Sequence, residues 1–317
     1  MTPMPALCTF DIDTSGAAHS VLHTDPMRQN CYRWSHWDLG DEDLLPWAMN
    51  TLPEVVVASL MQVETRPRAT GFDKGAIVAL RGMNLNPGHD DEDMVSLRAW
   101  VTENTVVTVR RRKLLAVDDI RKTAETGHAP STSWALLADM VAGLSIRIQR
   151  KSIEMEEATL TFEEQIFESE WNMPGVEFAQ LRRGVIRIHR YIAPQAQALE
   201  DLVHIASENG CTNSAELNEL ANLMRRNVEE MASTASRLAA LFDHTQAQHA
   251  YKQGQNSFVL SIIAAIFLPL GFVMGLFGVN VAGMPGLEWP WAFATLCLSL
   301  VGITALAVLI LKRFKVW

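Results

Sequence analysis

A short run of small, apolar and amide residues near the end of the chain has the composition expected at the mouth of a cation pathway. Gly278, Val279 and Asn280 follow residues 258–277, which contain no charged side chain. A ring of Asn280 amides from several copies of the chain would present neutral oxygen dipoles, and these accept hydrogen bonds from the water shell of a divalent ion. Asn280 also suits a capping role after Gly278. The two roles are compatible, and we predict that the tripeptide is a selectivity filter.

The segment that leads into this tripeptide offers no strong metal ligand. Residues 258–277 include no Asp, Glu, His or Cys. Zinc that has lost its water prefers nitrogen and sulfur donors. An ion that crosses here should therefore keep most of its hydration shell.

Two further places carry donors for cations. Glu288 is the only charged residue in loop 278–290; it would concentrate cations at an outer mouth if several copies surround an axis, or it is an incidental surface acid. Asp243, His244 and His249 offer oxygen and imidazole ligands. The two histidines point about 140° apart on a helix, since five steps of ~100° separate them. We therefore expect a metal site here only where neighbouring chains meet.

Two acidic stretches are weaker candidates. Residues 89–93 read His-Asp-Asp-Glu-Asp and are expected to form an exposed hairpin loop between strands. Seven glutamates fall between residues 154 and 170 without an intervening Lys or Arg. That pattern is typical of a solvated helix face.

The elements that must position the tripeptide are two apolar helices. Residues 258–277 and 291–311 are free of charge, and each run is close to the ~20 residues that cross a ~30 Å hydrocarbon core. Backbone groups in lipid must hydrogen-bond within their own segment. Both runs are therefore predicted to be membrane-spanning helices, with the first one lining a pore.

Basic residues indicate how these helices are oriented. Lys252 precedes the first run and the tail 312–317 is basic, whereas loop 278–290 has neither Lys nor Arg. The positive-inside rule then predicts that both termini are cytoplasmic and that the loop faces outward.

The first 130 residues are predicted to form an α+β cytoplasmic domain. Val-rich runs bounded by Gly, Pro, Asn or Asp predict strands, and apolar-periodic segments predict helices. The predicted strands are residues 32–39, 76–82, 95–102 and 105–110, and the predicted helices are residues 41–49, 52–62 and 115–125.

Residues 131–257 are predicted to form long cytoplasmic helices and a stalk. The first helix covers residues 133–170, and the second covers 177–207, where Pro194 is expected to bend or interrupt it. The third begins at Ser214 and can continue without a break to residue 277. Its apolar residues repeat every 3.5 positions, as in a coiled-coil seam. The seam comprises Leu217, Ala221, Met224, Val228, Met231, Ala235, Leu238 and Phe242.

Two membrane helices cannot enclose an ion pathway, so we expect several copies of the chain around an axis. The seam is the surface expected to pack these copies together. Residues 243–257 are polar but carry few charges. They form either a solvated helix or the lining of a water-filled inner vestibule.

Composition excludes several classes of function. The net charge of -9 argues against nucleic acid as a partner. The four cysteines are scattered, so no disulfide framework or structural zinc site is indicated. The N-terminus lacks the pattern of a secretory signal peptide. We find no motif of a hydrolase, P-loop or dinucleotide-binding enzyme, and we predict neither enzymatic activity nor a cofactor.

The motifs around the first span resemble the CorA metal-ion transporter family. That family's usual signature is Gly-Met-Asn after a span with a Met-Pro or Leu-Pro step, and Val279 in the middle position resembles the ZntB-like zinc transporter branch. Glu64 to Arg68 is similar to a helix end of that branch, and Ala193 to Gln195 to its long second helix. The segments that carry the resemblance are Phe267-Leu268-Pro269-Leu270, Gly275 to Asn280 and Met284-Pro285-Gly286.

The resemblance implies a homopentameric funnel whose cytoplasmic domain has α/β/α layers. It also implies that the first span lines the pore and that the second faces lipid. The implied pore-lining positions are Leu260, Ala264, Leu268, Gly271 and Gly275, which fall on one helical stripe. Leu260 and Leu268 would then be hydrophobic constrictions; ordinary helix or lipid packing is the alternative.

The chain is thus predicted to be a multi-pass protein of the bacterial inner membrane that transports divalent cations, with zinc as the preferred ion. The resemblance allows proton-coupled uptake, and zinc efflux is an alternative. A magnesium, cobalt or nickel channel of the same fold, and a tethered signalling or scaffold protein, are the competing functions. The predicted parts are residues 1–130, 131–257, 258–277, 278–290, 291–311 and 312–317.

Overall fold

The computed structural model describes residues 6–90, 92–168, 175–279, 286 and 289–313. The chain divides into two compact units, Met1–Phe242 and Asp243–Trp317. Each is described by itself. The predicted boundary at residue 130 falls inside the first unit.

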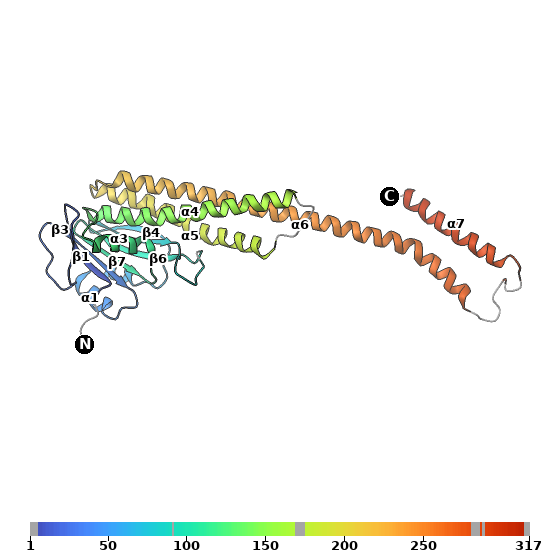
Figure 1. The fold of residues 1–317 in the computed structure, drawn as a ribbon, viewed down its shortest axis with the longest axis horizontal. Coiled ribbons are helices and arrows are strands. Elements are labelled where there is room, and N and C mark those ends of the chain that lie inside the picture. The colour runs from blue at the N-terminus through green and yellow to red at the C-terminus, as the bar shows by residue number, and fades with distance from the viewer. Residues whose placement is uncertain (1–5, 91, 169–174, 280–285, 287–288, 314–317) are drawn as a thin grey trace. The chain divides into compact units, whose positions relative to one another are not determined.

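The first unit contains a mixed sheet. In the described residues it has seven strands in the order β2-β1-β3-β7-β6-β5-β4, and β3 and β7 form its parallel pair. Figure 1 shows the sheet with helices packed along it. The strands are β1 Cys8–Asp13, β2 Ala18–Ser20, β3 Cys31–Asp38, β4 Arg68–Phe72, β5 Gly75–Gly82, β6 Val95–Val101 and β7 Thr105–Arg110.

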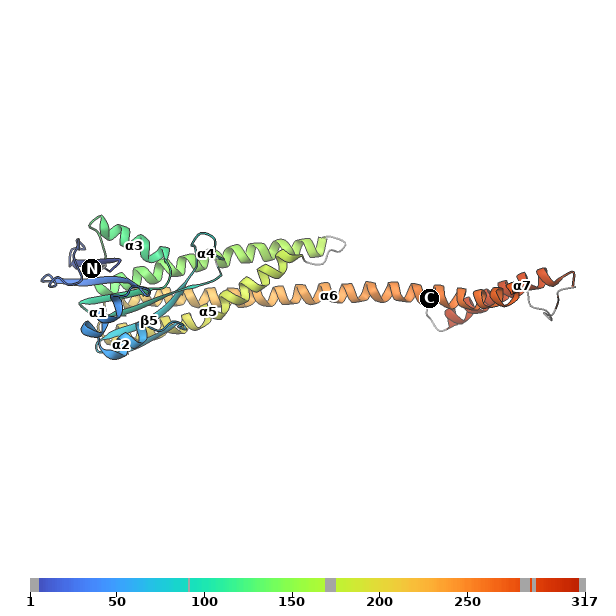
Figure 2. The same cartoon turned by 90° about the horizontal axis from the view of Figure 1, so that it is seen from below.

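Helices cover both faces of this sheet. On one face α1 Leu44–Thr51 and α2 Glu54–Leu60 enclose a core that includes Trp37, Ile77 and Trp100. The opposite face carries the larger core beneath the other helices of the unit (Figure 2). These are α3 Leu115–Glu125, α4 Ser133–Glu168, α5 Val176–Glu208 and the first part of α6 Ser214–Gly278. The α/β/α layering implied by the resemblance is confirmed.

The central strands are mostly apolar because both of their sides are covered. Every residue of β6 is buried. Successive side chains point to opposite faces, so Leu97 and Ala99 enter the larger core while Trp100 enters the smaller one. The four predicted strands and the predicted helices of this domain are confirmed, with ends that shift by a few residues.

Three predictions for this unit need correction. The strands β1, β2 and β4 have no counterpart among the predicted strands, since they are short or carry Asp, Gly and His. The segment Glu64 to Arg68 is not a helix end, because α2 stops at Leu60 and β4 begins at Arg68. Of the two effects predicted for Pro194, the interruption is wrong, because α5 continues through it to Glu208; the bend stays a prediction.

The coiled-coil seam packs on its own chain. Leu217, Met224, Met231 and Leu238 are almost fully buried in the larger core together with residues of α4 and α5, and the Arg182 guanidinium of α5 lies 4.9 Å from the ring centroid of Phe242. The prediction that this seam joins separate copies is therefore wrong. Helices α4 and α5 of the same chain cover this seam.

The second unit consists of the last part of α6 and of α7 Ala292–Arg313. The prediction of one uninterrupted helix from Ser214 to residue 277 is confirmed, since α6 is a single helix of 65 residues that includes Pro269. The second predicted span is confirmed as α7.

Candidate functional site: the apolar helix pair

The second unit exposes long apolar helices. Both α6 and α7 contain a window that is long and apolar enough to cross a membrane, and no residue of either window is buried within the chain. Each apolar helix in water would cost a large hydrophobic free energy, at roughly 25 cal/mol per Å² of apolar surface. These surfaces therefore require a partner outside the chain, either lipid or other protein.

One stripe of α6 faces α7. Ile262, Ile266, Leu270 and Val273 are half-buried, whereas most of their neighbours are exposed. Leu270 lines an apolar cavity of about 740 Å³ together with residues of α7 that include Leu300 and Thr304. The two helices therefore meet along this stripe.

The predicted pore stripe lies on the opposite side of α6. Leu260, Ala264, Leu268, Gly271 and Gly275 are all exposed, and Leu260 and Leu268 each retain 71% of their accessible surface. Each of these positions is two residues from a member of the α7-facing stripe. Two residues correspond to about 200° around a helix. The two stripes are thus nearly back to back.

The glycines of this stripe are not needed for packing within the chain. A Cβ atom built on Gly271, Gly275 or Gly278 meets no atom within 4 Å. Glycine is otherwise unfavourable inside a helix by about 1 kcal/mol relative to alanine. Small residues at such positions let another backbone approach closely or keep a lumen wide.

Polar side chains within the described spans are satisfied by their own helix. The hydroxyl groups of Ser261, Thr295 and Thr304 donate to backbone carbonyls one turn earlier, at 2.9, 3.0 and 2.9 Å. Asp, Glu and His are absent from both runs. The chemistry available to an ion is thus limited to water, backbone and apolar walls along most of the span.

The predicted filter lies at the end of this stripe. Gly278 is the last residue of α6, and Val279, which follows it, is 55% exposed. Asn280 and Glu288 lie outside the described residues. Their roles as filter amide and outer-mouth acid stay predictions.

The predicted metal ligands of the stalk do not form a site within one chain. Asp243, His244 and His249 are exposed on α6, and His244 Nε2 lies 2.8 Å from Nε2 of Gln248. Among the described residues no group of three or more His, Cys, Asp and Glu side chains is arranged to hold a metal ion. A site shared between chains stays a prediction.

The acidic stretches have structural partners. The loop that contains residues 89–93 joins β5 to β6, as predicted, and it is exposed at His89, Asp90 and Asp93 but half-buried at Glu92. Its Asp93 accepts from Arg187 of α5 at 2.9 Å. On α4, Glu163 forms an ion pair with Arg237 of α6. These acids therefore hold elements of the first unit together.

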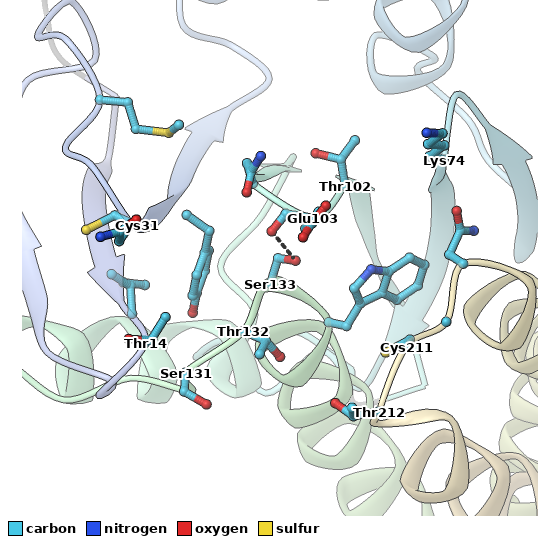
Figure 3. A pocket seen from close by; sticks show the side chains of 18 of the residues that line it. Thr14, Cys31, Lys74, Thr102, Glu103, Ser131, Thr132, Ser133, Cys211 and Thr212 are labelled. Carbon is cyan, nitrogen blue, oxygen red and sulfur yellow. Dashed lines mark hydrogen bonds between the residues drawn. The ribbon is translucent and has the colours of Figure 1, made fainter.

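The first unit has a large polar cavity at one end of its sheet. It measures about 1210 Å³, and Figure 3 shows turns and the start of α4 around it. Ser133 Oγ donates to the carbonyl oxygen of Glu103 at 3.0 Å, and Tyr32 donates to that of Pro130 at 2.6 Å. Its ionisable lining is nearly balanced. Two basic and three acidic residues contribute, namely Arg28, Lys74, Asp73, Glu103 and Glu208.

Sequence reasoning did not identify the stripe of α6 that faces α7. Ile262, Ile266, Leu270 and Val273 have the same apolar character as the residues around them. The signal that separates the two stripes is the position of Gly271 and Gly275, because bulky residues fill the α7-facing stripe and glycines interrupt the other.

Comparison with known proteins adds an independent finding. The family model described as CorA-like Mg2+ transporter protein matches residues 29–313. The zinc transport protein ZntB of Yersinia enterocolitica is 29% identical over 302 residues, which cover 93% of this chain and 91% of that protein. The divalent cation transporter CmaX of Pseudomonas aeruginosa is 32% identical over 289 residues, covering 89% and 86%.

A solved structure shares the whole architecture. The structure of the full-length CmaX protein superimposes with a TM-score of 0.85 at 28% identity, and the match covers 99% of this chain and 98% of that one. The similarity therefore includes both the α/β unit and the pair of apolar helices.

Proposed function

Because the chain belongs to the family of CorA-like Mg2+ transporter proteins, we propose that it transports hydrated divalent cations, with zinc preferred, across the bacterial inner membrane. Divalent cation transport is the activity of the family. The preferred ion, the pathway and the direction of transport are specific to the proposal.

The observation that carries the proposed pathway is the pair of opposed stripes on α6. One stripe faces α7, whereas Leu260, Leu268 and Gly275 of the other stripe are exposed. In a ring of copies the first stripe would lie toward α7 and lipid, and the second toward the axis. Leu260 and Leu268 would then form apolar constrictions that gate by dewetting.

The pathway needs several copies of the chain, and we propose a homopentamer on the basis of the family resemblance. Both termini would be cytoplasmic, since the basic residues flank the spans on one side only. Asn280 rings would face the hydrated ion at the outer end, and Glu288 would attract cations to it. Residues 243–257 would line a wet inner vestibule, where Asp243, His244 and His249 of adjacent chains could meet a passing ion.

Preference for zinc is supported by relatives and not by ligand chemistry. The ZntB protein of Yersinia enterocolitica is a zinc transport protein by name, and Val279 matches that branch. The spans themselves contain no carboxylate or imidazole that would distinguish zinc from magnesium. Discrimination would therefore act on hydrated ions or in the vestibule. Proton coupling would need the wet pore or a cytoplasmic relay, for the same reason.

Flux measured in proteoliposomes tests the proposal. The full-length protein should carry zinc into vesicles, and a pH gradient of either sign separates proton-coupled uptake from passive flux or efflux. Asn280→Ala should lower zinc flux by about tenfold or more, since losing hydrogen bonds of about 1 kcal/mol in several subunits exceeds the 1.4 kcal/mol that corresponds to a factor of ten. Asn218→Ala, at an exposed stalk position, is the matched control.

Two results would contradict the proposal. Unchanged flux in Asn280→Ala, with assembly intact, would remove the filter assignment. No metal flux at all in the wild-type protein would favour a tethered scaffold whose spans only anchor it.

A magnesium channel of the same fold is the second candidate. The absence of Asp, Glu, His and Cys from the first span, residues 258–277, favours it, because magnesium gives up its water shell reluctantly. Magnesium flux that exceeds zinc flux, and that zinc does not compete for, would select this alternative.

A further inference from the structure

A second cavity of the first unit is lined by arginines. It measures about 760 Å³ and lies where the segment after α2 passes β5, β6 and α5. Among the described residues of its wall, Glu64 is the single acid. The basic residues of its wall are Arg66, Arg81, Arg111, Arg112 and Arg190.

Strand register brings three arginines to one place on the sheet. Arg81 of β5 pairs with Ser96 of β6, and the next pair on the same face is Ala79 with Arg98. Arg98 in turn pairs with Val109 of β7. Arg111 follows Val109 by two residues, just past the end of that strand. Arg81 and Arg98 are thus diagonal neighbours, within reach of one another's long side chains. Like charges at such positions repel, and a counter-charge is expected between them.

Among the described residues no carboxylate forms an ion pair with these arginines, although Glu64 lines the cavity and acts electrostatically on Arg81. Arg98 is only 1% exposed, and its Nη2 donates to the carbonyl oxygen of Val63 at 3.2 Å. Its Nε and Nη1 atoms have no hydrogen-bond partner, and neither does Nε of Arg81. In the described part of the chain neither Arg98 nor any of the five arginines of the cavity wall takes part in an ion pair. A buried guanidinium without an anion is costly, because desolvation is not offset.

The surroundings of Arg98 depress its pKa. Burial is the main cause, and the neighbouring charges of Arg81 and Arg111 add to it. The pKa of Arg81 is lowered by burial as well, although Tyr191 and Glu64 oppose the change. An anion in the cavity would raise the pKa of Arg98 and of Arg81 back toward the usual value.

The cavity is built on a fixed frame. Strand β4 pairs with β5 only as far as Ala79, so the backbone of Arg81 has no strand partner on that side. The buried side chain of Gln195 on α5 replaces it, accepting from Arg81 N at 2.6 Å and donating to Arg81 O at 3.1 Å. The guanidinium of Arg81 donates to the carbonyls of Thr65 and Met94 at 2.7 and 3.1 Å and lies 5.0 Å from the ring centroid of Tyr191. Arg81 is therefore held in position before any ligand arrives.

The polar cavity of Figure 3 provides a contrast. There, basic and acidic residues nearly balance, and no buried side-chain atom of its described lining lacks a hydrogen-bond partner. In the arginine cavity five basic residues face one acid, and a buried arginine behind them is unsatisfied. The arginine cavity therefore carries an excess of positive charge within a chain whose net charge is -9.

We propose that the arginine cavity binds an organic phosphate that carries at least two negative charges. Guanidinium groups bind phosphate oxygens in pairs of parallel hydrogen bonds. The volume lies within the roughly 300–1,000 Å³ of small-molecule sites, which is larger than one inorganic anion requires. Arg81 would hold one phosphoryl group, with the buried charge of Arg98 beside it. The exposed wall residues Arg66, Arg111, Arg112 and Arg190 would contact the rest of the ligand near the opening.

Calorimetric titration of the full-length protein in a non-ionic detergent, with EDTA to remove metals, tests the proposal. Sodium pyrophosphate and ADP should bind saturably at 150 mM sodium chloride. Arg98→Gln and Arg112→Gln should each weaken binding by about tenfold or more, since a charge-assisted hydrogen bond contributes roughly that factor. Arg183→Gln is the matched control, because Arg183 is exposed on α5 and does not line the cavity.

The outcomes are distinct. Binding that is lost in Arg98→Gln and in Arg112→Gln but kept in Arg183→Gln supports the site; the surface variant keeps the test valid if the buried one fails to fold. No saturable binding by the wild type overturns it, as does pyrophosphate that binds no tighter than chloride. Dioctanoyl phosphatidic acid separates two sources of the same chemistry: displacement of pyrophosphate at lower concentrations than ADP requires would support a lipid headgroup, and the reverse a soluble phosphate.

Discussion

The two units of this chain bury their side chains in opposite ways. In the first unit a buried charge is paired within the chain at Asp11, which is fully buried and receives two hydrogen bonds from the guanidinium of Arg33, at 2.7 and 2.9 Å. In the second unit large apolar side chains are exposed, with Leu268 and Phe272 each 71% accessible. The first unit therefore specifies its own packing. The second leaves apolar surface exposed that requires a partner outside the chain.

Matched leucine substitutions give the largest expected difference between the units. Leu144 of α4 is 1% exposed and lies against Gly82 of β5. Leu144→Ala should lower the free energy of unfolding by about 2–5 kcal/mol, because it leaves a cavity in the core. Leu268→Ala should change it by less than about 0.5 kcal/mol, yet should alter cation flux. Thermal unfolding of the full-length protein followed by tryptophan fluorescence, together with vesicle flux, measures both.

Equal destabilisation by the two substitutions would erase the contrast. It would mean that Leu268 packs within the chain and not on a surface that awaits a partner.

The two hydrogen bonds between the side chain of Gln195 on α5 and the backbone of Arg81 in β5 are the next test. Gln195→Leu keeps the side-chain size but removes both hydrogen bonds to the backbone of Arg81. Each buried group left without a partner costs about 1–3 kcal/mol, so the first unit should unfold at lower denaturant concentration. Gln197→Leu, at an exposed position of the same helix, should leave the midpoint unchanged. A lower unfolding midpoint in both variants would contradict the stabilising role of these two hydrogen bonds.

Acid should weaken the first unit more than the second. Burial, aided by the charge of Arg110, lowers the pKa of His36 from 6.5 to about 3, and its Nδ1 lies 2.8 Å from Oγ1 of Thr108. The folded state therefore binds fewer protons than the unfolded state between these values. The contribution of neutral His36 to the free energy of unfolding is fully present above about pH 6.5. It falls by about 1.4 kcal/mol for each pH unit below that value, down to about pH 3.

Unfolding midpoints measured between pH 7 and pH 5 check this dependence. His36→Gln should flatten it, while His204→Gln, at a side chain 78% exposed on α5, should not. The same slope in all three proteins would assign the acid sensitivity to other groups.

The smallest effect on stability is expected at the glycines of α6. Gly271→Ala and Gly275→Ala meet no atom within the chain, and alanine favours the helix by up to about 1 kcal/mol. Neither should weaken the fold of one chain. Both should change flux or assembly, as measured in vesicles and by native mass, if another backbone or the ion approaches this stripe. Gly302→Ala in α7, which is equally uncrowded, serves as the control.

Sequence patterns predicted most elements of the fold. The Val-rich runs that became β5, β6 and β7 are central strands, whose burial on both faces requires continuous apolar residues. The short outer strands β2 and β4 were missed because edge strands carry polar residues and depend on pairing with a neighbour. The seam of α6 was recognised, but its partner was assigned to another copy, since periodicity reveals an apolar face and not what covers it.

The candidate site divides in the same way. Charge-free runs of about twenty residues and the tripeptide at 278–280 are local features, so the sequence alone determined two spans, their ends and the likeness to a transporter family. The tertiary structure decided which stripe of α6 faces α7. It also decided that Arg81 and Arg98 lie close together with no ion pair among the described residues. Helix rotation and strand register bring together residues that are far apart in the sequence, and no local pattern encodes those distances.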